Sequence, residues 1–349
     1  LEHLIPDEIR FDAYDINTDN TFSKRFVKGQ VLFGRRRAYQ RKAAIAEFDG
    51  ICSGDITVIE AIEGKMVPEL LPFIIQTPVF FDYANRGSAG SLSPRVKWEH
   101  LADYEFELPP LEEQKILADK LWAAYRLKEA YKKLLDATDE MVKSQFIEMF
   151  GNPLSSKQKN ELKRLGQCCI INPRRPNIAL CDTDKVSFIP MPAVSEDGYL
   201  VDMADEEYGK VKKGFTYFEN NDVLFAKITP CMENGKGAIA YGLTNGIGVG
   251  STEFHVLRPI NGISSPYWLL TLTRMPIFRE RAAKNMSGTG GQKRVSASYL
   301  NHFMVGLPAI EEQRRFEAIY RQADKSKSVI QKALVYLNDI QSDELRKIA

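Results

Sequence analysis

The feature that most constrains this chain is an internal repeat that runs from one end to the other. Val31-Leu32-Phe33 returns 192 residues later as Val223-Leu224-Phe225, and Glu112-Glu113-Gln114 returns 199 residues later as Glu311-Glu312-Gln313. Three further pairs keep the same order: Ala44-Ile45-Ala46 with Ala238-Ile239-Ala240, Arg95-Val96 with Arg294-Val295, and Leu108-Pro109 with Leu307-Pro308. An offset that grows slowly indicates short loop insertions on a shared scaffold. We therefore expect the chain to fold as two copies of one unit.

Composition excludes several classes of protein. The 349 residues include 47 basic and 46 acidic ones, and 44% are hydrophobic, which is typical of folded domains and not of disordered or collagen-like chains. No apolar run approaches the ~18 residues that a membrane helix needs, so we expect a cytoplasmic protein without a membrane partner. The five cysteines form no Cys-x-x-Cys pair and have no histidine at ligand spacing. This pattern favours buried free thiols over disulfides or a zinc site.

Each copy ends in a stretch with heptad spacing. Pro110, followed by Glu112 and Glu113, is typical of a helix start. The residues that follow have a 4-3 spacing, at Leu117, Leu121, Ala124, Lys128, Tyr131, Leu135, Thr138 and Val142. The second copy repeats these positions 199 residues later, at Phe316, Tyr320, Ala323, Lys327, Ile330, Leu334, Leu337 and Gln341. The spacing predicts two helices of roughly 39 residues, each about 58 Å long, that pair as an antiparallel coiled coil.

A lysine occupies the same seam position in both helices, at Lys128 and Lys327. A buried lysine there would destabilise the pair but could fix its register. Alternatively, both side chains could extend outward at the edge of the seam and keep their charges in water. We favour the second interpretation.

The remaining parts of each copy have a different pattern. Short apolar runs bounded by turn residues predict strands at 30–33, 43–46, 56–59, 222–225, 237–241 and 253–257. A short helix is predicted over Pro266–Met275, with its counterpart at Glu69–Ile75. The fold class is therefore α+β, with two repeated strand-rich α/β domains joined by two long antiparallel helices. The predicted segments are a first globular copy (1–108), a central helix (109–151), a second globular copy (152–308) and a C-terminal helix (309–349).

Basic residues gather on connections rather than inside the predicted strands. Arg35, Arg36 and Arg37 follow the first Val-Leu-Phe strand, and Lys227 follows its repeat. A second polar loop precedes each long helix, at 86–95 and at 287–294. Small residues let the backbone approach a phosphate, while Arg, Lys, Gln and Ser can donate to phosphates and base edges. Solvated turns are the alternative interpretation of both loops.

Motifs for catalysis are incomplete. The glycine runs 246–250 and 288–291 lack the full patterns of nucleotide-binding loops. Asp55, Glu63 and Lys65 imitate the spacing of a metal-dependent nuclease, but the second copy has no equivalent set. The four histidines form no evident base for a nucleophile.

The repeated Val-Leu-Phe strand and the repeated helix start Leu-Pro-(Pro/Ala)-(Leu/Ile)-Glu-Glu-Gln resemble the specificity subunit of type I restriction-modification systems. The likeness covers essentially the whole chain. Leu1-Glu2-His3-Leu4 resembles a segment well inside the first target-recognition domain of such subunits. The first copy is also shorter ahead of its helix than the second, so we expect it to lack roughly 40 to 50 residues at its start.

The resemblance implies a non-catalytic subunit that gives a larger complex its DNA specificity. Each globular copy would read one half of a bipartite site in double-stranded DNA, and the helices would set the spacing between the halves. The subunit would dock two modification subunits, which methylate adenine with S-adenosylmethionine, and motor-nuclease subunits that use ATP and magnesium. It would need no cofactor of its own.

The expected DNA contacts follow from the basic and polar loops. For the first half-site they are Arg35, Arg36, Arg37, Tyr39, Arg41, Arg86, Ser88, Ser91 and Arg95. For the second half-site they are Lys212, Lys213, Lys227, Lys236, Ser251, Thr252, Gln292, Lys293 and Arg294. Residues 1–108 carry a net charge of −4 and residues 152–308 a net charge of +5. We therefore expect the second copy to contribute more of the salt-dependent binding.

Two other functions remain open at this stage. The chain could be a stand-alone metal-dependent nuclease that uses Asp55, Glu63 and Lys65. It could instead be a scaffold whose repeated domains bind other proteins and not DNA.

Overall fold

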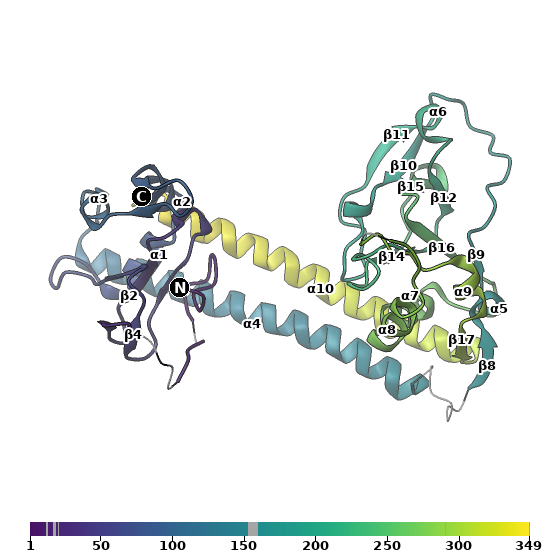
Figure 1. The fold of residues 1–349 in the computed structure, drawn as a ribbon, viewed down its shortest axis with the longest axis horizontal. Coiled ribbons are helices and arrows are strands. Elements are labelled where there is room, and N and C mark those ends of the chain that lie inside the picture. Colours follow the sequence, from purple (N-terminus) through teal and green to yellow (C-terminus); the bar gives the residue numbers. More distant parts are fainter. Residues whose placement is uncertain (12, 17–18, 20, 153–159, 290, 349) are drawn as a thin grey trace. The chain divides into compact units, whose positions relative to one another are not determined.

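The computed structural model describes residues 1–349 except 12, 17, 18, 20, 153–159, 290 and 349 (Figure 1). The chain separates into two compact units, Leu1–Leu134 with Val329–Ala349, and Leu135–Ser328. Each unit holds one globular copy and half of each long helix. The packing thus divides both helices, whereas the sequence segments 109–151 and 309–349 treat each helix as one piece.

The first unit is built on a three-stranded antiparallel sheet in the order β3-β2-β5. Its central strand is β2 (Val31–Gly34). All four residues of β2 are buried. The other elements are β1 (Lys24–Phe26), η1 (Ala38–Gln40), β3 (Ala43–Ile45), β4 (Gly50–Cys52), β5 (Ile56–Ile59), η2 (Pro68–Leu70), α1 (Leu71–Ile75), α2 (Pro78–Arg86), β6 (Ser88–Ala89), β7 (Arg95–Val96), α3 (Trp98–Ala102) and the first half of α4 (Leu111–Phe150). Each of the three predicted strands in this copy is confirmed to within a residue at its ends.

The second unit contains the same sheet with one more strand, in the order β14-β13-β16-β9. A second four-stranded sheet has the order β11-β10-β15-β12, and β17 pairs with β8. The strands are β8 (Glu161–Arg164), β9 (Cys169–Ile171), β10 (Lys185–Ile189), β11 (Ala204–Glu207), β12 (Thr216–Glu219), β13 (Val223–Ala226), β14 (Gly237–Ile239), β15 (Ile247–Gly250), β16 (Phe254–Pro259) and β17 (Met304–Leu307). The helices are α5 (Leu165–Cys168), η3 (Met191–Ala193), α6 (Tyr208–Val211), η4 (Thr244–Gly246), α7 (Pro266–Arg274), α8 (Pro276–Ala283), α9 (Ala297–His302) and α10 (Ile310–Leu345).

The repeat extends to the hydrogen-bond register of the strands. Val31 lies opposite Ile45 and Ile59, and Val223 lies opposite Ile239 and Leu257. These partners are equivalent in the two sequence copies. The pair β1-β4 likewise corresponds to β12-β15, while β10 and β11 have no counterpart among the described residues of the first unit. One local pattern therefore produces the same ladder twice.

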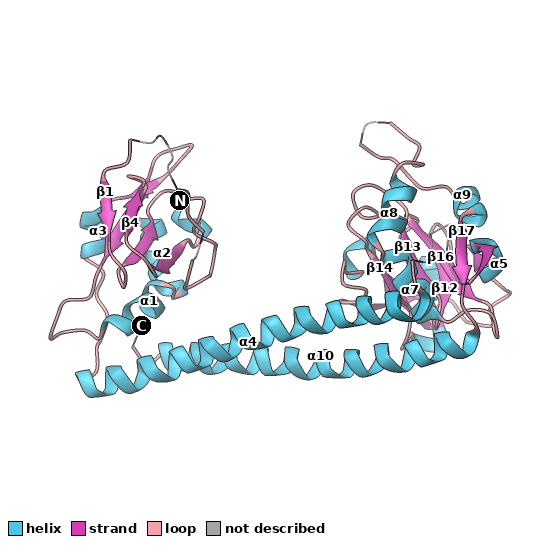
Figure 2. Ribbon diagram, turned by 90° about the horizontal axis from the view of Figure 1, so that it is seen from below, coloured by secondary structure: helices cyan, strands magenta, loops and turns pink. Residues whose placement is uncertain are grey.

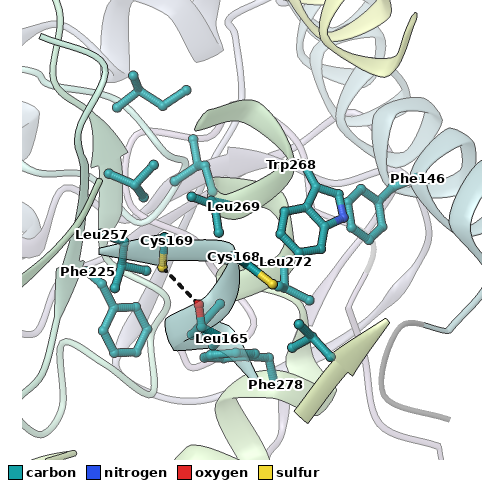
Figure 3. Close-up of a cluster of buried hydrophobic side chains, with 14 of the residues drawn as sticks. Phe146, Leu165, Cys168, Cys169, Phe225, Leu257, Trp268, Leu269, Leu272 and Phe278 are labelled. Atoms are coloured by element: carbon teal, nitrogen blue, oxygen red, sulfur yellow. Dashed lines mark hydrogen bonds between the residues drawn. The ribbon is translucent and has the colours of Figure 1, made fainter. Parts of the chain in front are cut away.

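The apolar core of each unit includes the adjoining half of the helix pair. In the first unit Phe33 and Phe73 belong to the same buried cluster as Leu121 and Trp122 of α4. In the second unit Trp268 of α7 lies beside Phe146 of α4, surrounded by side chains from the sheet and from α5 (Figure 3). The long helices are therefore an integral part of both cores.

The five cysteines are free thiols. Cys52, Cys168 and Cys169 are buried, as expected, and burial raises the pKa of the Cys168 thiol to about 11. Cys181, however, is exposed, so the expectation of buried thiols was wrong for that residue.

Within each unit the halves of α4 and α10 lie side by side and run antiparallel (Figure 2). In the first unit Lys128 Nζ donates to Gln341 Oε1 at 3.0 Å, and in the second Phe316 packs on Phe146 and Phe150. All sixteen predicted seam positions are buried or half-buried. The heptad prediction is therefore confirmed.

The favoured interpretation of the seam lysines was wrong for Lys327. Its side chain is only 9% exposed, and Nζ lies 2.5 Å from Asp139 Oδ1 and 4.8 Å from the centre of the Tyr199 ring. Lys128 is half-buried, and this burial lowers the pKa of its ammonium group. The Asp139 carboxylate on the facing helix half gives the Lys327 amine a polar partner inside the seam.

The glutamine of the repeated helix start holds each globular copy on its helix. Gln114 is fully buried: its Nε2 donates to the carbonyl oxygens of Lys65 and Pro109, and its Oε1 accepts from the backbone N–H of Val67. Gln313 repeats the three hydrogen bonds with Ile263, Pro308 and Ser265. The motif therefore satisfies buried and partly buried backbone groups where the helix meets the globular copy.

Candidate nucleic-acid interface

Three segments of the first unit meet beside the end of β2. The backbone N–H of Arg35 donates to Asp55 O at 2.9 Å, and that of Val96 donates to Arg35 O at 3.0 Å. The N–H of Arg37 donates to Pro94 O at 2.8 Å. The two basic loops, which are 50 or more residues apart in the sequence, therefore form one continuous surface.

The carboxylate of Asp55 lies at the centre of this surface. Arg95 Nε donates to its Oδ1 at 2.7 Å, and Arg36 Nη1 lies 3.4 Å from its Oδ2. Arg36 Nη2 also donates to Ser93 Oγ at 3.1 Å. The hydrogen bond from Arg95 is the main reason that the pKa of Asp55 is held below its ordinary value. Two guanidinium groups share one carboxylate, so the cluster keeps an excess of positive charge.

The second unit repeats this arrangement at equivalent positions. The N–H of Lys227 donates to Glu253 O, the N–H of Val295 donates to Lys227 O, and the N–H of Thr229 donates to Lys293 O, at 2.9 to 3.0 Å. Arg294 makes a bidentate pair with Glu253, with Nε–Oε2 at 2.9 Å and Nη2–Oε1 at 2.8 Å. The hydrogen bond from Arg294 lowers the pKa of Glu253 in the same way.

We call Asp55 with Arg36 and Arg95, and Glu253 with Arg294, the arginine–carboxylate clamps. The sequence prediction included the three arginines, but it named Asp55 only as a possible nuclease residue and did not include Glu253. A usable signal was present, because each carboxylate ends a Ser-x-acid turn, at Ser53-Gly54-Asp55 and Ser251-Thr252-Glu253. In both turns the serine Oγ accepts from the backbone N–H of the acidic residue, at 3.1 and 3.2 Å.

The other predicted residues of the first unit differ in accessibility. Tyr39 is 58% exposed on η1, between Arg37 and Arg41, which both have positive φ (54° and 53°). Backbone strain of this kind often accompanies binding loops. Arg41 instead faces the protein: its Nη2 donates to Gln76 O at 3.2 Å and its guanidinium covers the Phe81 ring at 4.9 Å. We therefore assign Arg41 to packing.

Three predicted residues lie beyond the clamp of the first unit. Arg86 is exposed at the end of α2, and Ser91 is exposed in the loop that follows. Ser88 Oγ donates to Ala84 O at 3.0 Å, which closes the end of that helix.

The predicted residues of the second unit fall into two groups. Thr252, Gln292 and Lys293 are exposed beside the clamp, and Lys236 lies across the hairpin from Ala226. Gly290, in the same loop, lies outside the described residues. Lys212, after α6, pairs instead with Asp182 at 2.6 Å, and its neighbour Lys213 is exposed. Among the described residues, the Lys212 side chain contacts Asp182 and not the clamp.

The glycine run 246–250 has a structural explanation. Residues 247–250 form β15, where a Cβ on Gly248 would lie 2.0 Å from the Phe218 ring. Close packing, and not phosphate binding, therefore requires glycine at that position.

The described part of the chain holds no group of three or more His, Cys, Asp or Glu side chains that could hold a metal ion. None of its helices is long and apolar enough to cross a membrane.

The chain resembles known proteins in sequence and in fold. The EcoAI specificity subunit of a type I restriction enzyme from Escherichia coli is 43% identical over 136 residues, which is 38% of this chain and 23% of that protein. The EcoEI specificity subunit of the same species is 39% identical over 154 residues, 43% of this chain and 25% of that protein. The matched segments therefore span about a quarter or less of these curated relatives.

The fold extends further than the sequence similarity. The S subunit of a type I restriction-modification system from M. genitalium covers 99% of this chain and 90% of its own, with a TM-score of 0.56 and 14% identity. The family model described as the type I restriction modification DNA specificity domain matches residues 13–137 and again residues 157–334. Because these two matches include most of both copies, the chain belongs to the family of type I restriction-modification DNA specificity domains.

Proposed function

We propose that this chain gives a type I restriction-modification complex its DNA specificity, with each globular copy reading one half of a bipartite duplex site. The observation that carries the proposal is the duplicated surface beside β2 and β13. In both units it joins two polar loops, presents arginine or lysine side chains, and is built on the same strand register. A split site needs two such surfaces, and the duplication supplies both on this chain.

The chemistry of these loops suits DNA. Arginine can donate two hydrogen bonds to guanine in the major groove, and lysine and backbone N–H groups can contact phosphates. The Nε atoms of Arg35, Arg36 and Arg37 are buried and have no acceptor among the described residues, so any contact of these side chains with DNA would use their Nη atoms.

The helix pair supports a role in assembly. Within the first unit, α4 and α10 expose Leu127, Val329, Tyr336 and Ile340, with exposed fractions from 36% to 67%. Leu127 occupies heptad position g of α4, while α10 contributes Val329 and Tyr336 at position c and Ile340 at position g, so these side chains share one face of an antiparallel pair. We propose that this face docks a modification subunit. Exposed apolar groups of this size are typical of protein interfaces.

The complete assembly would hold two modification subunits and the motor-nuclease subunits. S-adenosylmethionine, ATP and magnesium would be used by those partners, and this chain would need no cofactor. Acting on cellular DNA, the complex would be cytoplasmic. The helix pair would set the unspecified gap between the two half-sites.

Selection of bound sequences from a random duplex pool tests the proposal directly. The chain is mixed with its modification subunit at a stated salt concentration, because phosphate contacts make affinity salt-dependent. We expect two short conserved blocks around a gap of fixed length. A demonstrably formed complex that selects no consensus would refute the proposal and favour a protein-binding scaffold. Magnesium-dependent cutting by the isolated chain would support the nuclease alternative, although Asp55 is already paired with two arginines.

A further inference from the structure

We propose that Asp55 and Glu253 are positioning residues for DNA specificity, which hold Arg95 and Arg294, respectively, in the one orientation that reads each half-site. This inference rests on the proposed function and goes beyond it, because it assigns discrimination to acidic residues that would not be expected to contact DNA. It predicts that each carboxylate acts on one half-site alone.

The geometry connects one residue to both loops. The backbone oxygen of Asp55 accepts from Arg35 N in the loop after β2, while its side chain binds Arg95 in the other loop. Glu253 makes the equivalent two connections, to Lys227 N and to the Arg294 side chain. A change at either carboxylate therefore affects how the two loops are presented together.

Fold stability alone does not account for the clamps. The guanidinium side chains are 47% exposed for Arg95 and 40% for Arg294, while their carboxylate partners are 19% and 27% exposed. Water and salt reach the arginine side of each pair, which limits what the pair contributes to folding. A carboxylate on a DNA-facing surface also repels phosphates, which lowers affinity for every sequence. Its presence at equivalent positions in both copies is explained if it restrains the arginine from binding phosphates without regard to sequence.

The restraint has a physical rationale. A free arginine has many rotamers and can follow any nearby phosphate, whereas one held on two atoms of a carboxylate presents its remaining donors in a fixed plane. Specificity is a difference between two affinities, so a group that weakens contacts to all sequences improves discrimination when it weakens contacts to incorrect ones more.

The test compares Asp55→Asn and Glu253→Gln in the complex with the modification subunit. Affinity is measured for the selected duplex, for duplexes scrambled in the first or second half only, and for a fully scrambled duplex. For Asp55→Asn we expect affinity for the fully scrambled duplex to rise by about threefold. Discrimination at the first half-site should fall by about tenfold, as for a lost base contact, while that at the second half-site stays unchanged. Glu253→Gln should lower discrimination at the second half-site by about tenfold and leave that at the first half-site unchanged.

Matched controls remove the same charge elsewhere in each unit. Asp103→Asn, after α3, and Glu280→Gln, on α8, lie at exposed positions and should leave discrimination unchanged. Asp55→Glu keeps the carboxylate and should discriminate better than Asp55→Asn. Thermal unfolding of each variant checks that its fold is intact.

Three outcomes would overturn the inference. One is an equal loss of affinity for all duplexes, which would indicate a structural role. Another is a loss of discrimination at both half-sites from a single substitution. The third is a wild-type complex that reads a split site while Asp55→Asn and Glu253→Gln read it equally well. By contrast, a wild-type complex that selects no site at all would refute the proposed function itself.

Discussion

The two globular copies place a polar pair at the same point of their shared sheet, but only the second copy buries a charged one. In the second unit Arg258 donates to both carboxylate oxygens of Asp222, at 2.8 and 2.7 Å, and the Asp222 side chain is only 2% exposed. At the equivalent positions of the first unit, Gln30 Nε2 donates to Glu60 Oε2 at 2.7 Å on the exposed surface.

The comparison separates two roles of the side chain at this position, which is Asp222 in the second copy and Gln30 in the first: a contact within the turn and a contact across the strands. In both copies the side chain also accepts a backbone N–H three residues earlier, Glu219 for Asp222 and Val27 for Gln30. This turn contact is common to both, so the local backbone requires it. The partner across the strands differs, because a buried carboxylate needs a cation whereas an exposed amide does not.

The largest expected effect follows from breaking the buried pair. Among the described residues, Asp222→Ala leaves the guanidinium of Arg258 with Glu219 as its one acidic partner, at 2.9 Å. We expect a loss of about 3 kcal/mol in the free energy of unfolding. The equivalent change Gln30→Ala should cost about 1 kcal/mol or less. Chemical denaturation of both variants measures the contrast, and equal losses would show that burial does not separate the two sites.

The buried glutamines should show no such difference. Gln114→Ala and Gln313→Ala each remove three hydrogen bonds and leave backbone groups buried without partners. Each should therefore lower the free energy of unfolding by about 2 kcal/mol. Glu112→Ala and Glu311→Ala, exposed neighbours on the same helices, are the controls. A large effect in one copy only would contradict the equivalence of the two helix starts.

Charge should again distinguish the copies when DNA is bound. Lys227→Glu is expected to reduce the slope of log affinity against log salt concentration by about 0.9, the value for one phosphate contact. Arg36→Glu should reduce it less, because Arg36 already lies against Asp55. Binding titrations at several salt concentrations measure both slopes. Equal reductions of the two slopes would contradict the expectation that the second copy contributes more of the salt-dependent binding.

The smallest effect concerns pH. His255 is buried with Nε2 2.8 Å from Val295 O, and burial lowers its pKa below the ordinary value of 6.5. Below that ordinary value the unfolded chain binds more protons than the folded one, so the second unit loses stability as the pH falls and keeps it at higher pH. The first copy has Thr57 at this position.

His255→Thr should therefore reduce the dependence of the unfolding free energy on pH. Denaturation near about pH 7.5 and about pH 5.5 compares the variant with the parent chain. His302→Thr, at an exposed position on α9, is the control. If the pH dependence of the unfolding free energy is unchanged in His255→Thr, groups other than His255 cause it.

The elements that were predicted have local signals, whereas most of the shorter strands, among them β10, β11 and β12, were not predicted. The strands around Val31 and Val223, the helix over Pro266–Arg274 and the heptad seams follow from periods of two and of about three and a half residues. The candidate site was predicted less completely. Arg36, Arg95 and Arg294 were identified from loop composition, but Arg41 turns back onto Phe81, and no local pattern distinguishes it from its neighbours.

By itself, the sequence determined the duplication and the pairing of two long helices, because a repeated motif and a heptad period can both be recognised without knowledge of the packing. Only the tertiary structure decided that Asp55 meets Arg95, 40 residues away, and that Lys327 is buried against Asp139, 188 residues away. Whether a charged side chain is solvated, paired or held in place depends on what distant segments bring beside it. Burial and long-range pairing are properties of the packed chain, and a one-dimensional pattern does not contain them.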